Sequence, residues 1–546
     1  MSENKTSEIP TRNPLAEVTG APVSAPISAP ISGVKMLKCK INGVDVEVKA
    51  GTSVIEAFSQ NNQSIAHYCW HPGLSVAGVC RLCMVEIEGN PRLQIACNTA
   101  VTEGMVVNNA SEKVREAVKW GLDFHLINHP LDCPICDQAG ECGLQDQYME
   151  YGKYDPEMAQ PKVKKHKVVD LGPRVVLDTE RCILCSRCVR FTDEVSKTNE
   201  LGIFNRGDRA EVGTFDGKPL NNNYSTNVVD ICPVGALTSK DFRFRQRVWY
   251  LREHNTICTG CSTGCNTRAF YNKEGLFRIK PNYNKDVNGY WMCDVGRDVY
   301  KFVNKEARLL DARVNGEWMV PSLAAKKTGD VLRGGGSSIA FVVTGQYTNE
   351  EYDALLAFAK NEVGTNQVFH WINNPEHIEE FDGLLLRGDR NPNTRGLLDR
   401  LASNGLSAKW PELVQGLSTG AIKTVVVVGP ENQAAFPDLK AKIIELSKAN
   451  RLVWLQAGKN DQLEALAGDV TLIPLKTYVE KDGTFVNFKG LEQKVRKGLS
   501  IVPASLSMTE VIELMRGEAA VAIDTDVDQI GVGRVYNEFT LVRGHL

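Results

Sequence analysis

Residues 35–110 alternate apolar and polar positions in a pattern that predicts a small sheet with one helix. The stretches MLKCKI and VDVEVK have the period of two that half-buried strands show, and Asn42-Gly43 between them is the strongest two-residue hairpin signal. SVIEAFSQNN then has helical spacing, and Ser53 suits its N-cap. A long cysteine-bearing loop follows and runs into a further strand at MVEIEG.

A second helical pattern occupies SEKVREAVKWGLDFHLINHP, in which valine and leucine recur on one face. Ser111 suits the N-cap of this helix. Because Pro130 disfavours a helical conformation for the residue before it, we expect the helix to end at about His129. The imidazole would then lie at a helix terminus and face the cysteines that follow.

From about Ser337 the pattern changes. Four apolar runs of strand length, SSIAFVVTG, TVVVVGP, RLVWLQAG and DVTLIPL, alternate with amphipathic stretches such as EEYDALLAFAKNEV and FPDLKAKIIELSKAN. Strands that alternate with helices predict a doubly wound parallel sheet. RGGGSS precedes a strand instead of following one, which favours a linker over a phosphate-binding loop.

Length and charge narrow the class of protein. The 546 residues suffice for several domains, and the net charge of −3 gives no sign of a general nucleic-acid binder. No run of eighteen apolar residues predicts a membrane span. Residues 1–34 are rich in Pro, Ser and Ala and predict a flexible tail, without the features of a secretory signal or a mitochondrial transit peptide.

All sixteen cysteines lie between Cys39 and Cys293. Disulfides in a secreted protein are one interpretation, but close Cys-x2-Cys pairs without an export signal favour metal binding in a reduced, intracellular chain. Spacing divides the cysteines into four groups, the second completed by a histidine, and leaves only Cys39, which we expect to be a small buried hydrophobe. The groups are Cys69, Cys80, Cys83 and Cys97; His129, Cys133, Cys136 and Cys142; Cys182, Cys185, Cys188 and Cys232; and Cys258, Cys261, Cys265 and Cys293.

The first group predicts a [2Fe–2S] ferredoxin of the β-grasp type, because its loop lies between a helix and a strand of a small sheet. Its first gap is ten residues, whereas the plant-type spacing has four. Gly78 would let the backbone approach the cluster closely. His67 and His71 flank Cys69, and we interpret both as ordinary loop residues.

The second group alone is compatible with zinc, with an iron–sulphur cluster, or with a histidine that merely caps a helix. His125 is a competing ligand, but it lies on the helix and further from the cysteine loop. No spare cysteine lies nearby to complete the set, so we predict that His129 is the fourth ligand of a [4Fe–4S] cluster. A neutral imidazole in place of a thiolate leaves a cluster less negative and changes its potential.

The third and fourth groups each carry three cysteines on one short loop and a distant fourth, as a cubane requires. Cys232 precedes a proline, which is the ending of the bacterial ferredoxin signature. A two-cluster ferredoxin would have a cysteine at position 192, where this chain has Thr192, so we expect one [4Fe–4S] cluster in this segment. Gly260 and Gly264 would allow the tight loop of the fourth group, although zinc is an alternative for each group.

The order and spacing of the four groups resemble those of the large iron–sulphur subunit of bacterial NADH-quinone oxidoreductase (respiratory complex I), over roughly residues 35–305. CDVGRDVY resembles the iron–sulphur segment that opens molybdopterin oxidoreductases, and TYVEKDGTFVNFKG is similar to their Glu-x-x-Gly-Thr-x-x-Asn segment. The C-terminal half then resembles a shortened remnant of their molybdopterin domain. Because no cysteine follows Cys293 and the half is short, we predict no molybdenum and a structural or interaction role.

Other classes share some of these features. Iron-only hydrogenases and molybdenum formate dehydrogenases share the first two segments, but the former would need further cysteines in the C-terminal half. The latter would need a two-cluster ferredoxin and a catalytic metal ligand. A non-enzymatic iron–sulphur scaffold or redox sensor is a third alternative, although four clusters in one chain favour electron transfer.

The resemblance implies an electron-transfer subunit without catalytic residues of its own. Electrons would arrive singly from a flavin on a partner and pass through the first three clusters toward quinone, with the fourth cluster apart. The implied partners are the FMN/NADH-binding subunit, the 2Fe-2S subunit, a ferredoxin-like iron–sulphur subunit and the quinone-module subunits. The implied location is peripheral, on the cytoplasmic side of the bacterial inner membrane, with neither nucleic acid nor direct membrane insertion.

The expected fold is therefore multidomain, α+β and α/β. The expected divisions are a tail (1–34), a 2Fe-2S ferredoxin (35–110), a 4Fe-4S module with one His (111–152), a ferredoxin-like 4Fe-4S module (153–250), a molybdopterin-oxidoreductase-type 4Fe-4S module (251–307) and the degenerate α/β domain (308–546).

Overall fold

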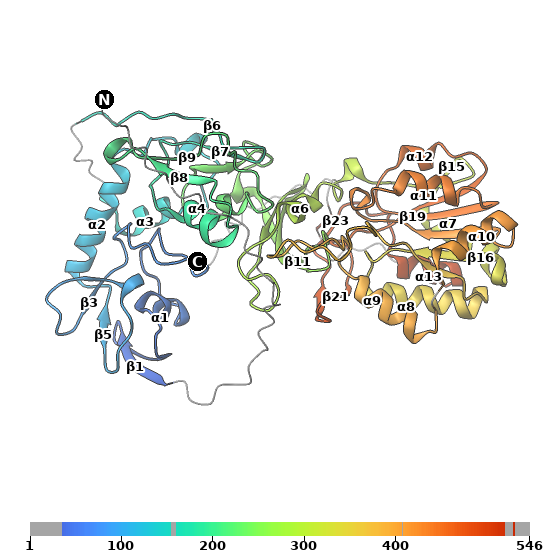
Figure 1. The fold of residues 1–546 in the computed structure, drawn as a ribbon, viewed down its shortest axis with the longest axis horizontal. Coiled ribbons are helices and arrows are strands. Elements are labelled where there is room, and N and C mark those ends of the chain that lie inside the picture. Colours follow the sequence, from blue (N-terminus) through green and yellow to red (C-terminus); the bar gives the residue numbers. More distant parts are fainter. Residues whose placement is uncertain (1–34, 154–159, 407, 519–527, 530–546) are drawn as a thin grey trace, which may run out of the picture.

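The computed structural model describes residues 35–153, 160–406, 408–518 and the backbone of 528–529, so the predicted tail lies outside the described residues. The molecule is elongated, with the first three cysteine-bearing segments at one end, the fourth segment in the middle and a large α/β sheet at the other end (Figure 1). Among the residues described, no helix has the length and apolar character needed to cross a bilayer.

The N-terminal sheet has five strands in the order β2-β1-β5-β3-β4. Its strands are β1 (Met36–Ile41), β2 (Val44–Lys49), β3 (Met84–Ile87), β4 (Gln94–Ile95) and β5 (Val106–Asn108). The predicted hairpin is present, and Asn42 and Gly43 both have the positive φ that a primed turn requires, 49° and 82°. Helix α1 (Val54–Gln60) begins at Ser53 with a capping box to Glu56, and Cys39 is buried in the core as predicted.

Helix α2 (Glu112–Leu126) begins at the predicted N-cap Ser111, whose side chain accepts a hydrogen bond from the backbone of Val114. It buries the valine and leucine stripe and ends just before His129, as Pro130 predicted. The cysteine loop then leads into α3 (Gly143–Tyr151).

The segment with the third cysteine group is mostly loop, supported by short elements. They are the sheet β10-β7-β6, the hairpin β8–β9 and helices α4 and α5, with bounds β6 (Val169–Asp170), β7 (Val175–Leu177), β8 (Leu201–Phe204), β9 (Glu211–Thr214), β10 (Leu237–Ser239), α4 (Arg187–Arg190) and α5 (Asn227–Asp230). The fourth group follows on a three-stranded antiparallel sheet with a short helix. These elements are β11 (Arg252–Ile257), β12 (Asn266–Asn272), β13 (Gly275–Pro281) and α6 (Asp294–Arg297).

The C-terminal sheet has seven strands in the order β15-β14-β20-β19-β18-β16-β17. Their bounds are β14 (Ala312–Val314), β15 (Glu317–Met319), β16 (Ile339–Val343), β17 (Val368–His370), β18 (Thr424–Val428), β19 (Arg451–Gln456) and β20 (Asp469–Pro474). Strands β16 to β20 pair in parallel, and four of them are the apolar runs that the sequence predicted. The result is a mixed α/β fold.

Helices cover both faces of this sheet because its strands are apolar on both sides. Phe341 and Val343 face the core under α7, α8, α9 and α13, whereas Ala340 and Val342 face the core under α10 and α11. The helices are α7 (Pro321–Leu332), α8 (Asn349–Phe358), α9 (Thr394–Ser403), α10 (Trp410–Thr419), α11 (Leu439–Leu446) and α13 (Met508–Arg516).

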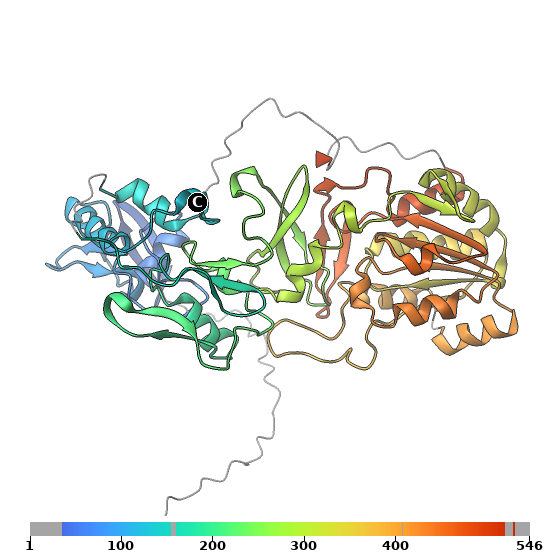
Figure 2. The same cartoon turned by 90° about the horizontal axis from the view of Figure 1, so that it is seen from above.

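One core crosses the expected division at residue 308. Tyr478, Phe485 and Val495 pack with residues of β11–β13, including Ile257 and Ile279. Figure 2 shows the red strands β21 (Gly483–Val486), β22 (Glu492–Val495) and β23 (Leu499–Ser500) beside the green strands of the fourth segment. The C-terminal segment therefore supplies part of the fold that holds the fourth cysteine group, which local patterning could not indicate.

Candidate iron–sulphur sites

The four cysteines of the first group are buried together beneath the loop that follows α1. The neighbouring thiol of Cys80 lowers the pKa of Cys69 to about 5, which favours a thiolate at this position. The thiol of Cys83 likewise lowers the pKa of Cys97. The amide of Tyr68 donates to the Cys80 Sγ at 3.4 Å, as backbone amides commonly do to ligand sulphurs.

His129, Cys133, Cys136 and Cys142 line one cavity of about 600 Å³. Burial, with help from the positive charges of Lys162 and Arg181, lowers the pKa of His129 to about 4, so the ring is neutral at physiological pH. Its Nδ1 is buried and has no hydrogen-bond partner among the described residues. A neutral imidazole with an unpaired buried nitrogen, next to three thiols, fits a metal ligand.

The wall of this cavity depends on a glycine from another segment. A Cβ at Gly235 would lie 2.1 Å from the Cys136 Sγ, so only glycine leaves room for the sulphur. His125, the competing ligand, instead hydrogen-bonds through Nδ1 to the carbonyl of Gly121 at 2.7 Å. This interaction ties the His125 ring to its own helix.

Cys182, Cys185, Cys188 and Cys232 line a smaller, largely apolar cavity. Leu184 and Ser186 alternate with the cysteines and have φ of 54° and 61°, a left-handed conformation that costs non-glycine residues free energy. Both residues reverse the backbone direction between successive cysteines, and the Leu184 amide donates to the Cys182 Sγ at 3.4 Å. Nothing in the sequence indicated the left-handed residues.

Cys258, Cys261, Cys265 and Cys293 are all buried. Burial, followed by the charges of neighbouring thiols of the group, raises the pKa of Cys258, Cys265 and Cys293. The amide of Gly260 donates to the Cys258 Sγ at 3.4 Å, and that of Gly296 donates to the Cys293 Sγ at 3.3 Å. Burial and amide donors to two of the four thiols suit sulphur ligands of an iron–sulphur cluster.

The third group contacts the segments of the second and fourth groups directly. The amide of Gly143, next to Cys142, donates to the carbonyl of Pro233, next to Cys232, at 3.0 Å. The side chain of Asn227 donates to the carbonyl of Met292, next to Cys293, at 2.8 Å. The third segment therefore lies at the centre of the cysteine-bearing half.

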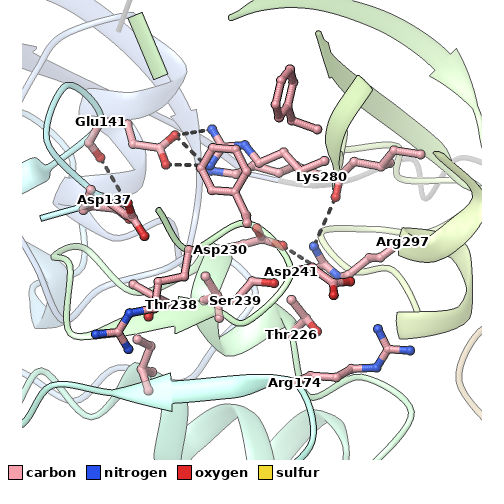
Figure 3. A pocket seen from close by; sticks show the side chains of 18 of the residues that line it. Asp137, Glu141, Arg174, Thr226, Asp230, Thr238, Ser239, Asp241, Lys280 and Arg297 are labelled. Carbon is pink, nitrogen blue, oxygen red and sulfur yellow. Dashed lines mark hydrogen bonds and ion pairs between the residues drawn. The ribbon is translucent and has the colours of Figure 1, made fainter. Parts of the chain in front are cut away.

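A charged cavity of about 60 Å³ lies where the second, third and fourth segments meet (Figure 3). Glu141 enters from the second segment and accepts from Arg278 and Lys280 of β13. Burial alone would raise the pKa of Glu141, but Lys280 and Arg278 outweigh it and lower the pKa to about 2. Arg297 pairs with Asp230 on the other side of the cavity. Charge pairs thus hold the three segments together.

The two loop histidines near the first group have local roles. His67 Nδ1 hydrogen-bonds to the carbonyl of Ile65 at 2.8 Å. His71 stacks on Trp291 with ring centroids 5.3 Å apart, which joins the first segment to the fourth. The sequence did not indicate this contact, because it joins rings more than two hundred residues apart.

Four family models match consecutive parts of the chain. They are described as a 2Fe-2S iron-sulfur cluster binding domain (residues 34–112), an NADH-ubiquinone oxidoreductase-G iron-sulfur binding region (121–156), an NADH-quinone oxidoreductase subunit 3 ferredoxin-like domain (172–238) and a molybdopterin oxidoreductase Fe4S4 domain (251–305). The chain is therefore an iron–sulphur protein with both 2Fe-2S and 4Fe-4S binding domains.

The curated relatives that the chain resembles are G subunits of NADH-quinone oxidoreductase. The chain is 34% identical over 341 residues to the G subunit of Rickettsia conorii, 40% over 271 residues to that of Streptomyces coelicolor, and 34% over 366 residues to that of Mycobacterium tuberculosis. These alignments cover 61%, 49% and 65% of this chain. The resemblance that the cysteine groups predicted is confirmed.

The chain spans half the length of these relatives or less, namely 50%, 32% and 45%. Among solved structures, a chain from the crystal structure of an NAD+-reducing [NiFe]-hydrogenase in the H2-reduced state aligns with 27% identity and a TM-score of 0.35. That alignment covers 39% of this chain and 91% of the other.

Proposed function

We propose that this chain is the electron-transfer subunit of an NADH-quinone oxidoreductase and passes electrons one at a time from an NADH/FMN module toward quinone. In the whole complex this transfer is coupled to proton translocation. The observation that carries the proposal is the gathering of four sets of soft ligands in adjoining segments, with the third set hydrogen-bonded to its neighbours. Bound iron–sulphur clusters would supply the one-electron chemistry.

The proposed ligands are the four groups named above, one set for a [2Fe–2S] cluster and three sets for [4Fe–4S] clusters. The amide donors to Cys80, Cys182, Cys258 and Cys293 support sulphur ligation, since such bonds stabilise negative charge on a ligand thiolate. The neutral ring of His129 supports its place as the one nitrogen ligand. We propose no catalytic residue in the chain, and we expect neither a complete NADH site nor a complete quinone site in it.

We further propose that the N-terminal sheet is a β-grasp ferredoxin and that the C-terminal sheet is a degenerate molybdopterin-oxidoreductase domain without molybdenum. The second part is supported by the segment that contains Glu480, which resembles those enzymes in sequence. Its carboxylate accepts hydrogen bonds from Arg308 and from the amides of Ile501 and Val502. A side chain with these partners holds the fold together and is not available to a cofactor.

Partner subunits are proposed from the surface beside the second group. Trp120, Phe124 and Leu131 border the cavity of this group and are 49%, 74% and 89% exposed. Large apolar side chains gathered in one place on a surface mark an interaction site. The proposed partners are the FMN/NADH-binding, 2Fe-2S, ferredoxin-like and quinone-module subunits, on the cytoplasmic side of the bacterial inner membrane.

The alternative metal is zinc, which also accepts four cysteines, or three cysteines with one histidine, as its ligands. Metal analysis of the full chain, purified without oxygen, separates the two. We expect about fourteen iron atoms per chain and neither zinc nor molybdenum in stoichiometric amount. Electron paramagnetic resonance of the reduced protein should then show four clusters. Stoichiometric zinc in place of iron, or bound molybdenum, would contradict the proposal.

The fourth group is proposed to lie apart from the main electron path, as the resemblance implies. Cys265→Ala tests this role, because it removes one ligand of that group and leaves the other three groups intact. We expect the signal of one cluster to be lost while electron transfer through the chain continues. Loss of transfer together with the signal would place the fourth cluster on the path.

A further inference from the structure

One arginine connects the first and third groups through the backbone next to a ligand of each. Arg187 lies on α4, between Cys185 and Cys188. Its Nη1 donates to the carbonyl of Ile231 at 3.0 Å, and its Nη2 donates to the carbonyl of Trp70 at 2.5 Å. Ile231 precedes Cys232 of the third group, and Trp70 follows Cys69 of the first. The guanidinium therefore joins the two ligand loops by hydrogen bonds.

Arg190, one turn further along the chain, makes the same kind of contact. Its Nη2 donates to the carbonyl of Cys69 itself and, at 3.4 Å, to that of Cys185. Its Nη1 donates to the carbonyl of Ser75 in the loop of the first group. Two guanidinium groups thus bridge the same pair of loops, which shows that the contact is built into this interface.

The charge of Arg187 has no carboxylate partner among the described residues, and its Nε is buried without a hydrogen bond. Burial lowers the pKa of Arg187, and the charged groups that oppose this effect are four cysteines, Cys185, Cys232, Cys69 and Cys80. A buried cation without a counter-ion is costly, and in the cluster-loaded chain the compensating negative charge would come from the ligand thiolates of both groups. A site of this kind suits a cation between two negatively charged clusters.

We propose that Arg187 is the positioning residue for electron transfer between the first and third groups, by raising the midpoint potentials of both clusters and by joining their ligand loops. This inference rests on the proposed function. A positive charge stabilises the reduced, more negative state of a cluster, so it raises the potential. The bonded path runs from Cys69 through Trp70, Arg187 and Ile231 to Cys232. In the proposed transfer, the cluster held by the Cys69 group would lose one electron and the cluster held by the Cys182 group would gain it, while Arg187 would keep its proton.

Redox titration of the full, cluster-loaded chain, followed by electron paramagnetic resonance, tests the charge. Arg187→Gln keeps a hydrogen-bond donor and removes the charge. We expect the ratio of oxidised to reduced centres at a fixed potential to rise about tenfold for both the first and the third cluster, which is a fall of about 59 mV for one electron. The second and fourth clusters should keep their potentials.

Arg247 offers a matched control, because it also donates to two backbone carbonyls of a ligand loop. Its acceptors, Pro134 and Cys136, both belong to the second group. Arg247→Gln should therefore lower the potential of the second cluster alone. Equal shifts of all clusters in either variant would mean a general effect of lost charge and would overturn the inference.

Arg187→Lys tests the bridge separately, because lysine keeps the charge but cannot form the planar two-pronged contact. We expect both potentials to stay near those of the unaltered chain, and the rate of transfer between the two clusters after rapid reduction to fall about tenfold. An unchanged rate of transfer in Arg187→Lys would overturn the proposed role of the hydrogen-bonded bridge. Unchanged midpoint potentials in Arg187→Gln would overturn the proposed effect of the charge.

If Arg187→Gln does not retain its clusters, the rate of transfer measured in Arg187→Lys still tests the inference. Failure of the proposed function would give a different result from failure of this inference, because the unaltered chain would then contain no iron.

Discussion

The carboxylate of Glu141 accepts one hydrogen bond from each terminal nitrogen of Arg278, both at 2.8 Å. Glu141 directly precedes Cys142 of the second group, and Arg278 lies on β13 beside the fourth group. Both side chains are mostly buried, at 24% and 12% exposed. The two-pronged geometry fixes the orientation of the segments as well as their contact.

We predict that Glu141→Gln lowers the free energy of unfolding by about 3 kcal/mol, because Arg278 and Lys280 lose their shared counter-ion in a mostly buried place. Urea unfolding of the full chain measures the change. Glu253→Gln is the control, since its pair with Arg268 is exposed and should contribute less than about 1 kcal/mol. Equal effects of the two substitutions would mean that the Glu141 pair does not hold the segments together.

The potential of the second cluster should depend on the nitrogen ligand. His129→Cys would replace a neutral ring by a thiolate and add negative charge, so the midpoint potential of that cluster should fall. The other three clusters should be unaffected. A redox titration followed by electron paramagnetic resonance checks this, and an unchanged potential with full iron content would show that residue 129 is not a ligand.

The pair Arg308–Glu480 is completely buried, at 0% and 1% exposed, and joins the end of the cysteine-bearing half to the C-terminal domain. Arg308 also donates to the carbonyls of Ala457 and Leu475. We predict that Arg308→Met lowers the free energy of unfolding by about 4 kcal/mol, because the buried charge of Glu480 then has no counter-ion. Limited proteolysis should detect loosening of the C-terminal domain while the first three clusters keep their signals.

The pair Arg451–Asp469, whose side chains are 34% and 33% exposed, provides the control for that substitution. Arg451→Met should change the free energy of unfolding by less than about 1 kcal/mol. Resistance of Arg308→Met to proteolysis, equal to that of this control, would contradict the structural role assigned to the buried pair.

His370 at the end of β17 should make the C-terminal domain less stable in acid. Burial lowers its pKa to about 4, and its Nε2 is buried without a partner among the described residues. Because the folded-state pKa is below the unfolded value of 6.5, the stabilisation is complete above pH 6.5 and is lost as the pH falls toward 4.

The expected loss from His370 between about pH 7 and about pH 5 is about 2 kcal/mol. His370→Gln should remove this part of the pH dependence. Urea unfolding of both proteins at the two pH values measures it, and any acid sensitivity of the clusters is common to both. An identical pH dependence in the two proteins would refute the assignment.

Much of the local structure followed from the sequence. The hairpin at Asn42-Gly43, the N-caps Ser53 and Ser111, the end of α2 before His129 and the parallel strands each depend on neighbouring residues. The core that joins Tyr478 and Phe485 to β11–β13 could not be predicted, because its contacts link positions about two hundred residues apart.

The candidate sites, like the fold, were predicted from the sequence only in part. Spacing alone selected side chains that the fold brings around common cavities, including His129 with its three cysteines. Their role as cluster ligands stays a prediction. The roles of Arg187 and Arg247 could not be predicted from the sequence, because their hydrogen-bond acceptors are backbone carbonyls, which carry no sequence signature.

By itself, the sequence determined how the candidate cysteine and histidine ligands divide into groups. This was possible because a loop that presents three thiols to one cluster is built from residues close together in the chain. Only the tertiary structure decided which ligand loops adjoin. The third group contacts the loops of the first, second and fourth through Arg187, Gly143 and Asn227. These contacts arise from packing between distant segments, where hydrogen bonds and burial, rather than spacing in the chain, fix the neighbours.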